Sequence, residues 1–131
     1  MTRDYQPQKN NPYLLPQPLY RMTLAFIRDY DRKRSEYRDL TEESPPPPDG
    51  QPRGSTTGNP TERSGIRRAE LWIAISAVED ALGSIPPEYQ LGVWENIVQY
   101  RRYPDDASPS TYKRYKQKFI FQVARNMLWV D

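Results

Sequence analysis

The sequence contains neither cysteine nor histidine. Without these residues the chain cannot form a zinc finger, a thiolate-bound cluster, a disulfide scaffold, a cysteine nucleophile or a histidine-based catalytic triad. Any metal would have to be a hard cation held by carboxylates. No pair of carboxylates and no serine beside a candidate base recurs at a spacing that indicates catalysis. We therefore expect a protein that is not an enzyme and that uses no cofactor.

Long apolar runs are also missing. No run of eighteen or more apolar residues exists, and the N-terminus is polar where a signal peptide would need a basic and then an apolar region. The 131 residues are enough for one domain of ordinary size. These features predict a cytoplasmic protein that does not bind membranes.

The charged residues nearly balance over the whole chain but not along it. The formal net charge is +2, yet residues 1–40 carry +3, residues 41–65 carry −2, residues 66–100 carry −3 and residues 101–131 carry +4. Two basic ends thus flank an acidic middle. This asymmetry is a reason to consider a polyanionic partner.

The first half of the chain divides into three segments by composition. Residues 1–18 hold four prolines among asparagine and glutamine, which is typical of an extended arm. Residues 19–43 contain no glycine or proline, and their apolar residues recur at spacings of three, four and seven, which predicts a first helix. Residues 44–58 are rich in proline and glycine and predict a linker.

Three further helices are predicted in a C-terminal helical domain of residues 59–131. The first begins with Asn59 as N-cap and ends at Gly83, and the second opens at Pro86-Pro87 and runs to about Tyr100. The last spans residues 109–128 behind Ser108. Since nothing alternates with period two, the fold is predicted to be all-α, a small bundle of about four helices.

The helix ending at Gly83 carries a seam of apolar residues at alternating spacings of four and three. Its members are Leu71, Ile75, Val78 and Leu82. Such a seam suits packing within the chain as well as a short coiled coil, so a homodimer is one of the expected states.

The last helix has two contrasting faces. At about 100° per residue, one face gathers apolar side chains, namely Tyr112, Tyr115, Phe119, Ile120, Val123 and Met127. The outer face gathers Lys113, Arg114, Gln117, Lys118, Phe121 and Arg125 and has no acidic residue. Lys116 falls inside the apolar arc, where its stem is expected to snorkel toward water.

Such a helix suits insertion into the major groove of double-stranded DNA. Phosphates would be held by Ser110, Thr111 and the helix N-terminus, whereas Lys113, Arg114 and Gln117 would reach base edges. Additional basic contacts would come from Lys118 on the helix and from Arg101 and Arg102 before it. The competing interpretation is a terminal helix that its basic residues merely keep soluble.

The order of these segments resembles the phage transcriptional regulators of the RinA/ArpU type. The resemblance rests on the following short motifs: Arg53-Gly54-Ser55, Asn59-Pro60-Thr61, Ala69-Glu70-Leu71, the stretch from Leu82 to Val93, and Ser110-Thr111 with Arg114 in the closing helix. It implies a DNA-binding regulator of late or lytic phage genes, acting in a bacterial host and resembling the helix-turn-helix of sigma factors. Host RNA polymerase or another protein would be a further partner.

One departure from that group leaves two alternatives open. A helix-turn-helix has a supporting helix and a turn of three or four residues before its recognition helix, but Pro104 and Pro109 prevent a helix over residues 101–109. Either the preceding helix takes the supporting role, or the unit has become a protein-binding module or an inhibitor of a host protein. An exposed face built from the acidic residues of the middle and Trp72 would favour the second alternative.

Overall fold

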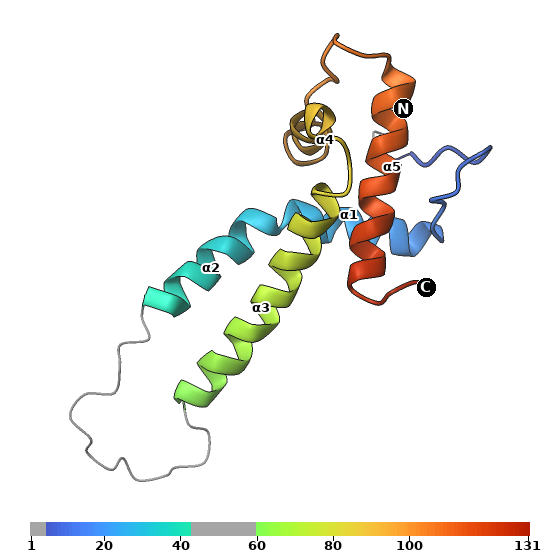
Figure 1. Cartoon of the computed structure of the whole chain (residues 1–131). Helices are drawn as coiled ribbons and strands as arrows, with labels where there is room; N and C mark the ends of the chain where they lie inside the picture. The colour runs from blue at the N-terminus through green and yellow to red at the C-terminus, as the bar shows by residue number, and fades with distance from the viewer. Residues whose placement is uncertain (1–4, 43–59) are drawn as a thin grey trace, which may run out of the picture.

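The computed structural model describes residues 5–42 and 60–131, and within these ranges it consists of helices and loops with no strand. Five helices are present: α1 (Gln17–Arg28), α2 (Tyr30–Glu42), α3 (Pro60–Leu82), α4 (Pro87–Gln99) and α5 (Pro109–Asn126) (Figure 1). The all-α prediction is confirmed. The predicted linker of residues 44–58 and the predicted N-cap Asn59 lie outside the described residues.

The N-terminal boundary of α1 was predicted two residues too late. The helix begins at Gln17, so Pro18 lies in its first turn and Pro16 is the N-cap. Proline is tolerated there because the first backbone N–H groups of a helix have no partner within it. The first intrahelical bond, from Tyr20 N to Pro16 O, measures 2.9 Å.

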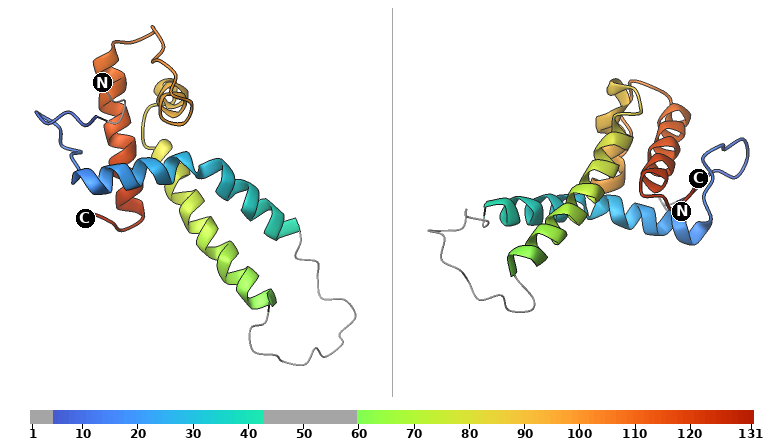
Figure 2. Two further views of the ribbon diagram at one scale, coloured as in Figure 1. Left: turned by 180° about the vertical axis from the view of Figure 1, so that it is seen from behind. Right: turned by 60° about the horizontal axis from the view of Figure 1, so that its bottom comes forward.

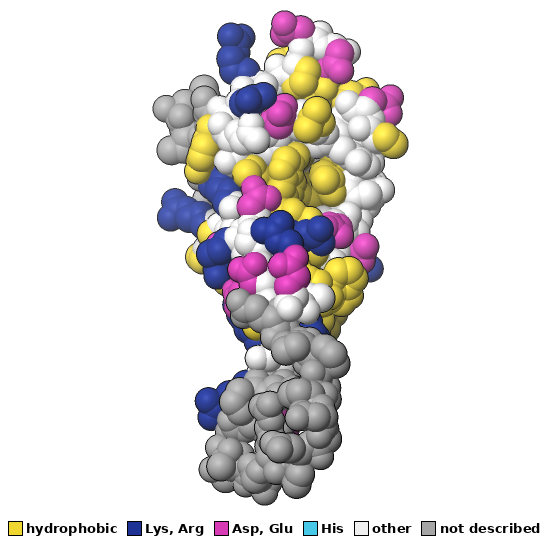
Figure 3. Space-filling view, turned by 90° about the vertical axis from the view of Figure 1, so that its left-hand side faces the viewer, with side chains coloured by type: hydrophobic (Ala, Val, Ile, Leu, Met, Phe, Trp, Pro, Cys, Tyr) yellow, Lys and Arg dark blue, Asp and Glu magenta, His cyan; other side chains and the backbone are white. Residues whose placement is uncertain are grey.

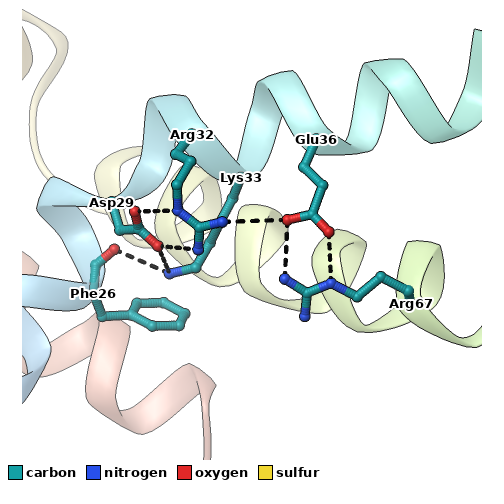
Figure 4. A network of polar contacts seen from close by, with 6 residues as sticks. All are labelled: Phe26, Asp29, Arg32, Lys33, Glu36 and Arg67. Carbon is teal, nitrogen blue, oxygen red and sulfur yellow. Dashed lines mark hydrogen bonds and ion pairs between the residues drawn. The ribbon is translucent and has the colours of Figure 1, made fainter.

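Within the described residues, the predicted first helix is divided into two helices that meet at Asp29, which explains why this part of the chain has five helices and not about four. Figure 4 shows the cause. Lys33 Nζ donates to the carbonyl of Phe26 over 3.3 Å, lies 3.6 Å from the centre of the Phe26 ring, and is 3.7 Å from the Asp29 carboxylate. A side chain that takes a carbonyl of the helical ladder bends the helix there.

Helices α2 and α3 form an antiparallel pair that projects from the rest of the molecule (Figures 1 and 2). Arg67 on α3 joins the two through Glu36 on α2, with Nε–Oε2 and Nη2–Oε1 distances of 2.8 and 3.0 Å. These bonds hold the pKa of Glu36 below its ordinary value. The pair thus extends as one arm of the fold.

The hydrophobic core lies where α1, α4, α5 and the C-terminal part of α3 meet. Its fully buried side chains include Tyr20, Leu24, Ile27, Ile97, Phe119, Ile120 and Val123. Of the predicted seam on α3, Leu71, Ile75 and Val78 are buried within the chain, and α3 ends at Leu82, directly before Gly83 as predicted. The seam therefore serves packing within the chain.

Candidate nucleic-acid interface

The start of α5 is fixed by the cap that the sequence predicts. Ser108 is the N-cap, its Oγ accepts a 3.3 Å hydrogen bond from Thr111 N, and Pro109 opens the helix. The predicted apolar face is buried at Tyr112, Phe119, Ile120 and Val123. The helix ends at Asn126, two residues before the predicted end, and Met127 serves as C-cap.

Helix α4 precedes α5 in the sequence and packs against it. Figure 1 shows α4 end-on beside an upright α5, so the two helices cross steeply. Residues 100–108, which contain no helix, connect them. Aromatic contacts hold them together: the Tyr89 ring lies 4.9 Å from Tyr115, and the Trp94 ring lies 6.3 Å from Phe119.

The segment between α4 and α5 is fastened to both helices. Tyr103 stacks on Tyr112 with 5.2 Å between ring centres, and Tyr112 OH donates to Asp106 Oδ1 over 2.5 Å. Burial and this hydrogen bond raise the pKa of Tyr112 to about 12. Gly92 on α4 allows the close approach, because a Cβ there would lie 2.7 Å from the Tyr112 ring and 2.9 Å from Pro104.

Lys116 does not snorkel, contrary to the sequence-based expectation. Its side chain is buried, and Nζ donates to Asn96 Oδ1 over 2.9 Å. The amide of Asn96 donates in turn to the carbonyl of Arg101 over 2.7 Å. The ammonium is thus part of the α4–α5 contact, because α4 covers the path along which the stem would have reached water.

Gln117 cannot be a base-reading residue as it stands. It is only 3 % exposed, and its Nε2 donates to Tyr20 OH on α1 over 3.3 Å. Viewed from behind, α1 crosses α5 (Figure 2, left). The helical wheel placed Gln117 on the outer face, and its side chain instead contacts α1 through Tyr20.

The N-terminal arm, residues 5–16, covers a further part of α5 and is not simply extended. The Gln6 side chain is buried and closes the arm into a loop: Nε2 donates to Leu15 O and Oε1 accepts from Leu15 N, both over 2.8 Å. Tyr13 lies against Phe121, with ring centres 5.7 Å apart. Phe121, predicted on the outer face, is therefore half-buried.

The open part of α5 includes a narrow strip that we call the basic stripe: Arg114, Lys118 and Arg125. Arg114 and Arg125 are exposed and Lys118 is partly so. None of the three forms an ion pair within the described residues, and α5 contains no acidic residue. Of the other predicted contacts, Ser110 and Lys113 are exposed and Thr111 is partly buried.

The two arginines before α5 differ from each other. Both are exposed, but Arg101 Nη1 pairs with Glu95 Oε2 over 3.1 Å, so its charge is partly compensated. Arg101 and Arg102 line a cleft of about 480 Å³ together with Pro109, which places them beside the start of α5. Sequence reasoning found these residues but not the pairing with Glu95.

An apolar groove lies on another face, between α2, α3 and α4. It has a volume of about 410 Å³, and Leu82, Pro87, Leu91 and Trp94 line it together with Asp31 and Glu79. In Figure 3, hydrophobic side chains gather in the middle of the face shown, with charged side chains around them. The Leu91 side chain is 66 % exposed. Sequence reasoning did not predict this groove.

Metal binding and membrane crossing can be examined in the part of the chain that the structure describes. It contains no group of three or more acidic side chains placed to hold a metal ion, and none of its helices is long and apolar enough to cross a membrane. Comparisons with known protein families, curated proteins and solved structures returned no match.

Proposed function

We propose that this protein is a DNA-binding transcriptional regulator of phage or prophage origin, in which α5 faces double-stranded DNA and α4 supports it. The observation that carries this proposal is the basic stripe. Three cationic side chains lie along one open strip of a helix that has no acidic residue, and none is neutralised by an ion pair within the described residues. Such a strip attracts the phosphates of nucleic acid.

The contacts divide by position. Exposed Ser110 and Lys113 and the half-open Thr111 sit in the first turns of α5, where side chains and helix N-termini bind phosphates. Arg114 extends from the second turn and is the residue that we assign to base edges. Lys118 and Arg125 follow one and three turns later and contact the DNA backbone.

The proposal can be tested by measuring the anisotropy of a fluorescent duplex at two salt concentrations. For three contacted phosphates, affinity should fall roughly 40-fold between about 50 mM and 200 mM salt. Lys118→Ala and Arg125→Ala should each weaken binding and reduce the salt slope by about one, whereas Arg114→Ala should weaken binding and relax the sequence preference. Phage genomic fragments in the same assay would reveal sequence preference.

Arg38→Ala is the matched control, because Arg38 is exposed on α2 and its removal changes the net charge by the same amount. It should leave DNA binding unchanged. Equal losses of DNA affinity in Arg38→Ala and Arg114→Ala, or a DNA affinity that does not change with salt concentration, would count against the proposal.

A second candidate is a protein-binding module, and the apolar groove between α2, α3 and α4 favours it. Exposed Leu91 and half-buried Trp94 provide apolar contact, while exposed Asp31 in the lining suits a partner segment with lysine or arginine. Leu91→Glu would abolish such docking and leave the basic stripe untouched. Loss of the regulator's activity in that variant, with DNA affinity intact, would favour the second candidate.

A further inference from the structure

A second cationic site lies between the N-terminal arm and the first turns of α5. We call it the arm pocket; its volume is about 380 Å³, and its lining includes Lys9, Tyr13, Ser110, Lys113, Arg114 and Gln117. It joins two segments about a hundred residues apart in sequence. The residues expected to bind DNA lie on α5 or directly before it, at Arg101 and Arg102, so the contribution of the arm is new.

The charge of the arm pocket is uniform. Lys9, Lys113 and Arg114 are exposed cations, and no acidic residue belongs to the lining. Within the described residues none of the three forms an ion pair, whereas Arg32 on α2 binds Asp29 over 2.6 Å. Three uncompensated cations around one small volume favour a phosphate group, because charge-assisted bonds to phosphate are the strong ones.

The arm is fixed in a shape that holds Lys9 over α5. Beside the Gln6–Leu15 bonds, Asn11 Nδ2 donates to Pro7 O over 2.9 Å, and Tyr13 N donates to Asn11 Oδ1 over 3.0 Å. The loop is thus closed at its ends and across its middle. A site formed in advance binds its ligand without the cost of ordering a flexible segment.

Gln117 adds an observation that points to a ligand with a donor group. Its side chain is 97 % buried and lines the arm pocket, and its Oε1 has no hydrogen-bond partner within the described residues. A buried acceptor of this kind requires an explanation. A hydroxyl or amino group of a bound molecule would donate the missing hydrogen bond to Oε1. A nucleotide carries such donor groups, and inorganic phosphate is a poorer donor.

We propose that the arm pocket binds the phosphate of a nucleotide, with Lys9 and Lys113 holding the phosphate, Arg114 beside them, and Gln117 accepting from a sugar hydroxyl. The nucleotide is either the one at the 3′ end of a nucleic-acid strand or one free in solution, since both carry a free sugar hydroxyl. The inference deepens the proposed function and rests on it for the nucleic-acid source.

The test is calorimetric titration of the full chain with dAMP, inorganic phosphate and adenosine. We expect dAMP to bind more tightly than inorganic phosphate and adenosine not to bind. Lys9→Ala should weaken dAMP binding about tenfold, as expected for one lost bond to a charged group, and Arg38→Ala should not change it. Absence of dAMP binding, or equal affinities of the two variants, would overturn the proposal.

A competition experiment separates the two sources and the two proposals. If dAMP displaces a fluorescent duplex, the pocket holds a strand phosphate; if both bind together, it holds a free nucleotide. Duplex binding without dAMP binding would refute the nucleotide site in the arm pocket and leave the proposed function standing. Binding of dAMP without duplex binding would refute the proposed function and leave the nucleotide site standing.

Discussion

Gly92 offers the sharpest test of how α5 is held against α4. It is buried in the middle of α4, where a glycine lowers helix stability by about 1 kcal/mol relative to alanine. Replacement by alanine would therefore stabilise an isolated helix. In this fold the new methyl group would lie 2.7 Å from Tyr112 Cε1 and 2.9 Å from Pro104 Cδ.

The Tyr112 ring, which the new methyl group would meet, cannot move aside. Tyr112 is fully buried, stacks on Tyr103, meets Tyr89 edge-on with 5.3 Å between ring centres, and is tied by its hydroxyl to Asp106. Overpacking of this kind costs about 1–3 kcal/mol. After the gain in helix propensity, the Gly92→Ala variant should lose up to about 2 kcal/mol of unfolding free energy.

Gly65 on α3 is the matched control, since a Cβ there would meet nothing within 4 Å. Gly65→Ala should gain about 0.5–1 kcal/mol from propensity alone. Urea denaturation followed by circular dichroism measures both variants. If both alanines stabilise the protein equally, the close packing of α4 against α5 at this point is wrong.

Three further predictions concern hydrogen bonds and pH. Asn96→Ala removes the 2.9 Å partner of buried Lys116, and should cost about 2 kcal/mol by urea denaturation. The pKa of Tyr112 is raised to about 12. The neutral phenol therefore stabilises the fold fully below the unfolded pKa near 10, and this stabilisation is lost as pH rises through about 12. Over that pH range, the urea midpoint of the Tyr112→Phe variant should fall less than that of the wild type. The pKa of Glu36 is lowered mainly by its hydrogen bond to Arg67. The ionised carboxylate therefore stabilises the fold at pH 7, and this stabilisation is lost as pH falls through the lowered pKa. Glu36→Gln should lower the free energy of unfolding by less than about 1 kcal/mol at neutral pH and leave it unchanged in strong acid.

The helix boundaries set by local chemistry could be predicted from the sequence. Pro87 and Pro109 open helices, Ser108 caps one, and Gly83 follows the end of another, because each effect depends on a residue and its immediate neighbours. The break at Asp29 could not be predicted in this way. It depends on Lys33 reaching back to the Phe26 carbonyl, in a stretch where charges of both signs would equally suit a continuous helix.

In the candidate site, too, the features set by nearby residues could be predicted from the sequence and those set by distant contacts could not. A helical wheel separates the apolar face of α5 from the rest, and that separation holds at Tyr112, Phe119 and Val123. It does not reveal which other elements cover the remaining sides. Gln117 was placed outside because polarity was its only signal, and its burial depends on Tyr20, which lies ninety-seven residues earlier.

The burial of Gln117 also changes what the proposed regulator should recognise. A glutamine at a DNA-facing position pairs with adenine through two bonds, whereas arginine and lysine pair with O6 and N7 of guanine. With the Gln117 amide directed to Tyr20 and Lys113 assigned to phosphates, the side chain left on α5 to reach base edges is Arg114. Recognition by this helix should therefore favour guanine, and substituting guanines of a preferred fragment should weaken its binding to the wild type but not to Arg114→Ala.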